Sequence, residues 1–263
     1  MNATTTRVRL LDGFRVSVDD VPAEGLPRGV QRLIAHLSLR GRPAREAIAG
    51  QLWPDVSESH AHGSLRPALW RIQKAVPGLV DVSGGAVTLA AGVRVDVREL
   101  LGWARAVLDP RTPADRTDAP AAALAGELLP GWCDDWVLLE RERLRQLRVH
   151  ALEALADRLV LAGRYAEAVQ AAHAAARDEP LRESAHRALI RVRLAEGDVA
   201  EAIRVHDEFR DALARELGVP PSRQMQDLVS RWRLRVAAGD RGTVGVPRPR
   251  PAADPVTVRA PGA

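Results

Sequence analysis

The fold is decided by residues 44–90, which read AREAIAGQLWPDVSESHAHGSLRPALWRIQKAVPGLVDVSGGAVTLA. Apolar side chains recur at helical spacing through 44–52, and Pro54 stops this helix. A second helix is expected over 57–76, with Ser57 placed to cap its start and a Pro-Gly pair to end it. The stretch therefore predicts two helices joined by a short turn.

Short strands and one more helix are expected around this pair. Alternating apolar residues predict two strands around a turn in 7–19 and two more at 79–82 and 86–90. Helical spacing also predicts an earlier helix over 28–39. The resulting order, β-β-α-α-α-β-β, is typical of a winged helix-turn-helix, whose recognition helix lies in the DNA major groove. We assign residues 1–95 to this domain.

The helix over 57–76 has one apolar face. At about 100° per residue, these side chains cluster toward the core: Ala61, Leu65, Ala68, Leu69, Ile72 and Val76. Trp70 falls on the opposite face, where it can contact DNA or pack against the wing or the helical domain; packing is the favoured interpretation. Pro67 removes a helical hydrogen bond, so either the regular helix starts near Ser64 or it kinks at Pro67.

Six residues are candidates for DNA contact. Arginine pairs with guanine edges or phosphates, and lysine pairs with phosphates. A glycine turn between the two wing strands can approach the adjacent DNA backbone. The candidates are Ser64, Arg66, Arg71, Gln73 and Lys74 on the helix and Gly84 in the turn. Exposed basic helices are often only solvated faces, so this interpretation depends on the surrounding order of elements.

From Asp96 onward the chain is predicted to be helical almost throughout. One helix is expected over 96–108, a loop over 109–120, and a short apolar helix over 121–129. A long helix begins near Asp134, whose side chain and that of Asp135 suit N-capping. Trp132, Trp136 and Tyr165 are expected in the core. Residues 96–238 form the second predicted domain.

A repeat of 34 residues runs through this second domain. Gly163-Arg-Tyr-Ala-Glu-Ala168 recurs as Gly197-Asp-Val-Ala-Glu-Ala202. A 34-residue period of helix pairs is the tetratricopeptide (TPR) signature, in which small residues let paired helices approach closely. The predicted fold class is therefore mainly α: a winged helix-turn-helix with short strands, followed by an all-α, TPR-like domain.

Composition excludes several classes of protein. Cys133 is the only cysteine, so neither an intrachain disulfide nor a cysteine-based zinc site is expected. Lys74, the only lysine, precedes Ala75, which excludes a phosphate-binding GxxxxGK[S/T] loop. His60 and His62 point in different directions on a helix, so no metal is expected. No catalytic constellation is evident, and we expect neither an enzyme nor a cofactor.

The distribution of charge and of apolar residues along the chain indicates where the protein is located and how it ends. The basic excess lies in residues 1–100 and 241–263, whereas 101–240 is mildly acidic. No stretch reaches 18 apolar residues and no signal peptide is evident, so we expect a cytoplasmic protein with no membrane association. Residues 239–263 are rich in proline, arginine, glycine and alanine and are expected to be a disordered tail.

These motifs together resemble the SARP family (Streptomyces antibiotic regulatory proteins) of bacterial activators. The resemblance covers about residues 7 to 235. It rests on Gln31-Arg32-Leu33, Leu52-Trp53-Pro54-Asp55, Ser64-Leu65-Arg66-Pro67-Ala68-Leu69-Trp70-Arg71, Val95-Asp96-Val97, Gly126-Glu127-Leu128-Leu129-Pro130-Gly131, Asp134-Asp135-Trp136-Val137, Glu140-Arg141-Glu142-Arg143-Leu144, Glu179-Pro180-Leu181-Arg182-Glu183 and Arg215-Glu216-Leu217-Gly218-Val219-Pro220-Pro221-Ser222.

The resemblance implies an OmpR-type winged helix followed by a bacterial transcriptional activator domain. Such proteins activate secondary-metabolite (antibiotic) gene clusters by binding direct repeats in double-stranded promoter DNA and recruiting RNA polymerase. The family's DNA-reading helix maps onto residues 58–76, and its contacts onto Arg66, Arg71 and Lys74. The chain resembles the small, stand-alone type, and the helical domain is expected to contact polymerase and to support a homodimer.

A second hypothesis remains open on the sequence. The modest charge of the N-terminal domain and the proline in its last helix are compatible with a TPR-type interaction or sensory module whose winged helix no longer reads DNA. Absence of any enriched sequence after selection from genomic fragments would favour this hypothesis.

Overall fold

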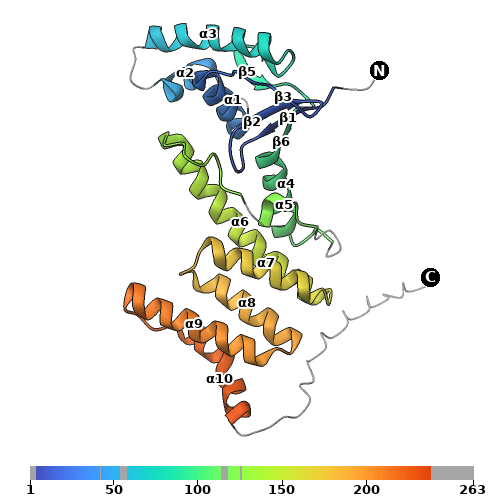
Figure 1. Cartoon of the computed structure of the whole chain (residues 1–263), viewed down its shortest axis with the longest axis vertical. Helices are drawn as coiled ribbons and strands as arrows, with labels where there is room; N and C mark the ends of the chain where they lie inside the picture. Colours follow the sequence, from blue (N-terminus) through green and yellow to red (C-terminus); the bar gives the residue numbers. More distant parts are fainter. Residues whose placement is uncertain (1–3, 42, 54–57, 114–117, 125, 238–263) are drawn as a thin grey trace, which may run out of the picture.

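The computed structural model describes residues 4–41, 43–53, 58–113, 118–124 and 126–237. The strands and the first three helices lie at one end of the molecule, and the last four helices lie at the other (Figure 1). One long helix, α6 (Asp135–Leu161), runs between the two ends. The predicted Ser57 cap and the expected tail at 239–263 lie outside the described residues.

The N-terminal sheet has four strands in the order β3-β2-β1-β6. β1 (Thr6–Arg9) and β2 (Arg15–Val18) are the antiparallel pair predicted within 7–19. β3 (Val21–Pro22) extends the sheet on one side, and β6 (Arg94–Val95) pairs parallel to β1 on the other. These two strands were not predicted, because two residues are too few to show an alternating pattern.

Three helices and a hairpin complete the winged helix-turn-helix. The helices are α1 (Arg28–Arg40), α2 (Arg45–Leu52) and α3 (Glu58–Ala75). The hairpin pairs β4 (Val80–Ser83) with β5 (Ala86–Leu89). Leu33, Ile48 and Ile72, one from each helix, are fully buried in the shared core, as their helical spacing predicts.

Asp96 fastens the sheet to α4 (Asp96–Leu108). Its carboxylate accepts hydrogen bonds from the backbone N–H groups of Leu10, Leu11 and Val97, at 2.7 to 3.0 Å. Burial raises the pKa of the Asp96 carboxyl, although these three N–H groups act in the opposite direction. The carboxylate thus joins the end of β1 to the first turn of the helix that leaves the domain.

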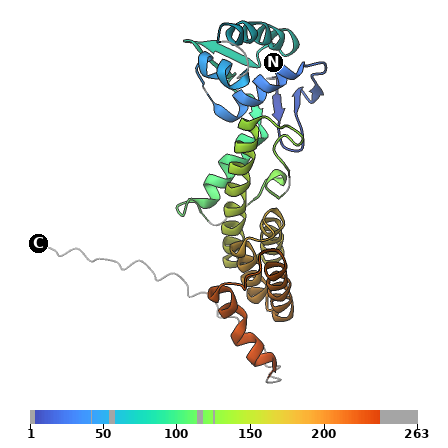
Figure 2. The same ribbon diagram turned by 90° about the vertical axis from the view of Figure 1, so that its left-hand side faces the viewer.

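The buried core of the winged helix also includes residues that follow position 95. Trp132, Trp136, Val137 and Leu144 are buried in the same cluster as the core of α1 to α3. The first turns of α6 therefore pack with the winged helix, and the rest of α6 packs with the helical array (Figure 2). The division at residue 95 stays a prediction.

The prediction of a helix over 121–129 is wrong for residues 126–129, which are not helical. Helix α5 covers only Ala121–Leu124. Further on, the backbone N–H of Leu129 donates to the carbonyl of Leu10 at 2.8 Å, and that of Asp12 donates to the carbonyl of Glu127 at 2.9 Å. Pairing with the end of β1 satisfies these backbone groups, so the apolar side chains enter the core without forming a helix.

The helical array consists of α6 to α10, in which each helix packs against the next one in the sequence. After α6 come α7 (Tyr165–Asp178), α8 (Glu183–Glu196), α9 (Val199–Leu217) and α10 (Arg223–Ala237). Their core is dominated by alanine, including fully buried Ala168 and Ala202 at equivalent places of the two repeats. Gly163 and Gly197 follow α6 and α8 with φ of 74° and 94°, as expected of residues that end helices.

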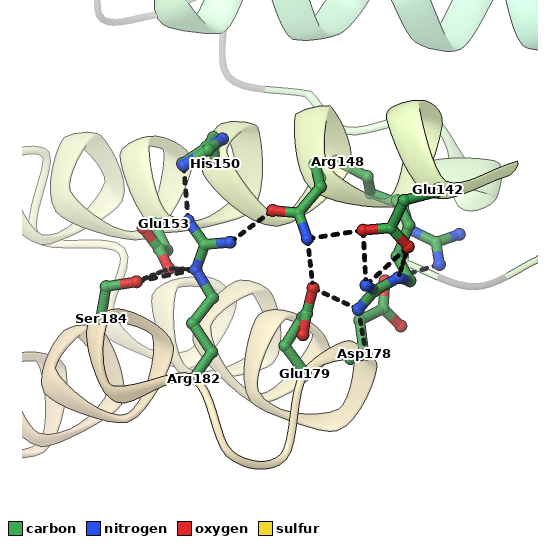
Figure 3. Close-up of polar contacts among 10 residues, drawn as sticks. Glu142, Arg148, His150, Glu153, Asp178, Glu179, Arg182 and Ser184 are labelled. Carbon is green, nitrogen blue, oxygen red and sulfur yellow. Dashed lines mark hydrogen bonds and ion pairs between the residues drawn. The ribbon is translucent and has the colours of Figure 1, made fainter. Parts of the chain in front are cut away.

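A polar cluster fixes α6 against the turn between α7 and α8 (Figure 3). Arg182 donates to Nε2 of His150 at 2.5 Å and lies 3.3 Å from a carboxylate oxygen of Glu153. Glu153 also accepts from the Ser184 hydroxyl at 2.7 Å, and Arg148 pairs with Asp178 at 2.5 Å. These interactions join residues about 30 positions apart in sequence, so they stabilise the packing of one repeat on the next.

Candidate DNA-binding surface

Helix α3 presents the polar face that the sequence predicts. Leu65 and Ile72 are buried against α1 and α2, whereas Arg66, Arg71, Gln73 and Lys74 are exposed. The half-buried Ser64 donates its hydroxyl to the carbonyl oxygen of His60 at 3.0 Å. Four of the five candidate side chains on α3 are thus directed to solvent, and the hydroxyl of the fifth is engaged within the helix.

Helix α3 carries three cations, Arg66, Arg71 and Lys74. In the part of the chain that the structure describes, no carboxylate pairs with Arg66, Arg71 or Lys74. By contrast, most exposed arginines of α8 and α9 pair with a carboxylate on their own helix or a neighbouring one, as Arg191 does with Asp157 at 3.0 Å. The free cations of α3 are therefore available to phosphate groups.

Pro67 lies inside α3, which begins upstream of it at Glu58. Its ring nitrogen has no hydrogen to donate to the carbonyl of Gly63, one turn earlier. Both residues are exposed, so water can satisfy the free carbonyl. The alternative in which the regular helix begins near Ser64 is wrong.

Trp70 does not pack against the wing or the helical domain. Its side chain is 62% exposed, and Nζ of Lys74 lies 5.2 Å from the centre of its ring. Helix α3 occupies the outer end of the molecule, away from α7 to α10, so its outer face meets none of these helices (Figure 1). The interpretation that favoured packing is wrong, although the helical wheel had placed Trp70 on the correct face.

The wing ends in a two-residue turn. Ser83 pairs with Ala86, and Gly84 and Gly85 between them have φ of 57° and 77°. Positive φ at both central positions is the geometry of a type I′ turn, which glycine adopts without a steric penalty. Gly84 is exposed, as are Val82 and Ser83 beside it. It lies on the hairpin that follows α3.

The winged helix is joined to α6 by ion pairs and aromatic contacts. Asp134 pairs with Arg32 at 2.6 Å, and Glu140 pairs with Arg40 at 3.2 Å. Trp136 meets the ring of His36 edge-on, with ring centres 5.5 Å apart. Both rings are buried, so this junction holds α1 in one orientation relative to α6.

Asp134 has a different role from the one predicted. It is the N-cap residue of α6 by position, but its side chain makes no capping hydrogen bond. The carboxylate is instead directed to Arg32 and also lies 3.8 Å from Arg28. Sequence reasoning missed this contact because it joins residues about 100 positions apart, and no local pattern indicates such a partner.

The order of elements and the exposed basic helix are those of a winged helix-turn-helix with an appended helical domain. The family model of the bacterial transcriptional activator domain matches residues 97–233, which is just over half of the chain. The chain belongs to this family and, within it, to the SARP activators.

Curated relatives agree with this placement. Regulatory protein AfsR of Streptomyces coelicolor is 34% identical over 222 residues, or 80% of this chain and 22% of that protein. Regulatory protein AfsR of Streptomyces griseus is 29% identical over 202 residues, or 72% of this chain and 21% of that protein. The chain thus spans about a fifth of the length of these relatives.

A solved structure of Mycobacterium tuberculosis EmbR in complex with a low-affinity phosphopeptide has the same fold. The TM-score is 0.69 with 17% identity, covering 87% of this chain and 65% of that one. This likeness shows the fold alone. By family, the chain is a transcriptional activator. None of its helices, within the part that the structure describes, is both long and apolar enough to cross a membrane.

Proposed function

We propose that this activator binds double-stranded promoter DNA through α3 and the wing. The observation that supports this most directly is a set of cations on α3 that have no anionic partner among the described residues: Arg66, Arg71 and Lys74. In a winged helix-turn-helix this helix enters the major groove, where arginine reads guanine and lysine contacts phosphate. Gln73 adds a side chain suited to adenine, and Gly84 lets the wing approach the backbone.

The helical array is proposed to contact RNA polymerase. On its exposed surface, arginines form ion pairs with carboxylates. Such a surface suits a protein partner better than a phosphate backbone, because these arginines already have anionic partners. Membership of the SARP activators supports the proposal that the targets are promoters of antibiotic gene clusters and that the protein binds direct repeats in them. It also supports action as a homodimer in the cytoplasm. The proposed domains are residues 1–95 for DNA and 96–238 for activation, followed by a tail at 239–263.

A charge-removal experiment tests the DNA-binding surface. Promoter fragments flanking the gene are titrated with the wild type and with the Arg71→Ala, Lys74→Ala double variant across a series of salt concentrations. Removing one cation that binds a phosphate should lower the slope of log K against log[salt] by about 0.9. The double variant should therefore bind more weakly, with a slope reduced by up to about two units.

The matched control removes the same charge elsewhere. Arg105→Ala with Arg223→Ala deletes two exposed arginines, on α4 and α10, far from α3. This variant should bind DNA like the wild type. If the Arg71, Lys74 variant binds with unchanged affinity and salt slope while remaining folded by circular dichroism, the assignment of α3 as the recognition helix is wrong.

The interaction-module hypothesis retains one observation in its favour. Pro67 and the internally bonded Ser64 leave the first half of α3 with fewer side chains for base contact than a regular recognition helix. Selection from genomic fragments separates the two hypotheses, because a module that no longer reads DNA enriches no sequence.

A further inference from the structure

A cavity of about 310 Å³ lies between α9, α10 and the turn that joins them. Pro220, Pro221 and Val229 supply apolar walls, and His206, Arg210 and Arg233 supply nitrogen donors. These helices lie at the end of the molecule opposite to α3 (Figure 1). The cavity therefore belongs to no part of the proposed DNA-binding surface.

His206 is the unusual residue of this cavity. It is only 4% exposed, and its buried Nε2 has no hydrogen-bond partner among the residues that the structure describes. Its other ring nitrogen, Nδ1, lies 3.1 Å from a terminal nitrogen of Arg233 and 3.2 Å from a carboxylate oxygen of Asp207. That oxygen already accepts from two guanidinium groups, whereas a guanidinium can only donate, so we assign Nδ1 as an acceptor. With Nδ1 as an acceptor, a ring proton lies on Nε2, as a buried N–H that has no acceptor among the described residues.

A second donor in the same wall is also unused. Nε of Arg233 is buried and has no hydrogen-bond partner in the described part of the chain. The terminal nitrogens of Arg233 and Arg210 pair with Asp207, which does not line the cavity. Buried donors without acceptors cost free energy, on the order of 1–3 kcal/mol each, unless water or a ligand satisfies them.

We propose that this cavity binds a small organic carboxylate with an apolar body. The carboxylate would accept from Nε2 of His206 and from the guanidinium groups of Arg233 and Arg210, and the body would lie against the two prolines and Val229. Carboxylate is the group that suits two guanidinium donors and an imidazole N–H together, since it offers acceptors only. The volume falls within the range of small-molecule sites.

The test compares anions with neutral molecules of the same shape. Benzoate, cinnamate and octanoate are titrated into the full-length protein beside benzamide, cinnamamide and octanamide. Long-range ¹H–¹⁵N correlation spectra follow the His206 ring nitrogens, whose shifts report a new hydrogen bond at Nε2. We expect saturable binding of at least one carboxylate, at least tenfold tighter than that of its amide.

Two variants with matched controls locate the site. Ser230→Trp fills the cavity from α10, and Gln224→Trp places the same ring on the exposed surface of that helix. Arg210→Gln removes a cation from the wall, whereas Arg204→Gln removes one from elsewhere on α9. Ser230→Trp and Arg210→Gln should each weaken carboxylate binding at least tenfold, and both controls should bind normally.

Three results would overturn the proposal. The first is the absence of any shift at His206 with all three carboxylates. The second is equal affinity for a carboxylate and its amide, which would indicate apolar binding without recognition of the anion. The third is carboxylate binding that survives both Ser230→Trp and Arg210→Gln, which would place the bound molecule elsewhere. Because Arg210 is only partly buried, its variant should stay folded even if Ser230→Trp does not.

Discussion

The carboxylate of Asp134, at the start of α6, forms an ion pair with Arg32 of α1 across 2.6 Å. The two side chains are 14% and 24% exposed, so the pair is more shielded from water than an ordinary surface ion pair. It lies beside the buried contact between His36 and Trp136. The orientation of the winged helix on the helical array thus depends on a charged contact next to an aromatic one.

A double-mutant cycle should detect this pair. Arg32→Ala, Asp134→Ala and the double variant should give a coupling free energy on the order of 1–2 kcal/mol in urea unfolding, above the range of exposed pairs. Arg94 and Glu99, 2.7 Å apart but about half exposed, provide the control pair. Their coupling should not exceed about 1 kcal/mol. Equal couplings for the two pairs would show that Asp134 does not fasten the junction.

Replacing Pro67 should stabilise the protein. The Pro67→Ala variant restores an N–H that can donate to the carbonyl of Gly63, and it removes the clash of the ring with the preceding turn. We expect a gain of about 1–3 kcal/mol in the free energy of unfolding, read from the urea midpoint. Pro77→Ala, in the turn after the helix, restores no helical bond and should give no such gain. A loss of stability in Pro67→Ala would mean that the proline relieves strain.

Elements with a repeating pattern were predictable from the sequence. Helices α3 and α6 to α9 each bury a stripe of side chains, and that stripe is visible as a period in the residues. The glycine turn of the wing was also predictable, because positive φ at Gly84 and Gly85 restricts the residues that can stand there.

Contacts between distant segments were not predictable in this way. The backbone of the segment around Leu129 forms hydrogen bonds with the end of β1. Its apolar side chains are buried for that reason, and not because they form one face of a helix. Trp70 was placed on the correct face of α3 but was expected to find a packing partner, since an exposed indole is uncommon. Both errors have one cause. A sequence shows which side of a helix or strand is apolar, but it does not show which other segment packs against that side.

The stability of the winged helix should fall in weak acid. Burial lowers the pKa of His36 from the ordinary 6.5, although its hydrogen bond to Gln51 acts in the opposite direction. A proton therefore binds to His36 more readily in the unfolded chain than in the folded one. The stability that is present above pH 6.5 is then lost as the pH falls toward the lower pKa that His36 has in the folded protein. His36→Gln should show a shallower decline in urea midpoint between about pH 7.5 and 5.

His173 and His186 limit the size of that effect. Burial lowers their pKa values as well, so part of the acid sensitivity should remain in the His36→Gln variant. At about pH 8 all three rings are neutral in both states, and the midpoint there measures the cost of the substitution alone. An unchanged pH dependence after correction for that cost would contradict a neutral, buried His36.

The small residues of the repeat should be intolerant of added volume. Ala168, in the first turn of α7, is fully buried in the alanine-rich core of the array, whereas Ala166 on the same helix is exposed. Ala168→Leu adds three carbon atoms where the helices approach closely and should cost about 1–3 kcal/mol. Ala166→Leu keeps the same composition and should change stability by less than about 0.5 kcal/mol.

The second repeat provides an independent test of the same principle. Ala202 stands 34 residues after Ala168 and is also fully buried, so Ala202→Leu should be destabilised by a similar amount. Urea unfolding of the three variants measures the differences directly. If Ala168→Leu proves as stable as Ala166→Leu, the close approach of α7 to its neighbours cannot be what selects a small residue there, and the 34-residue period would need another physical reason.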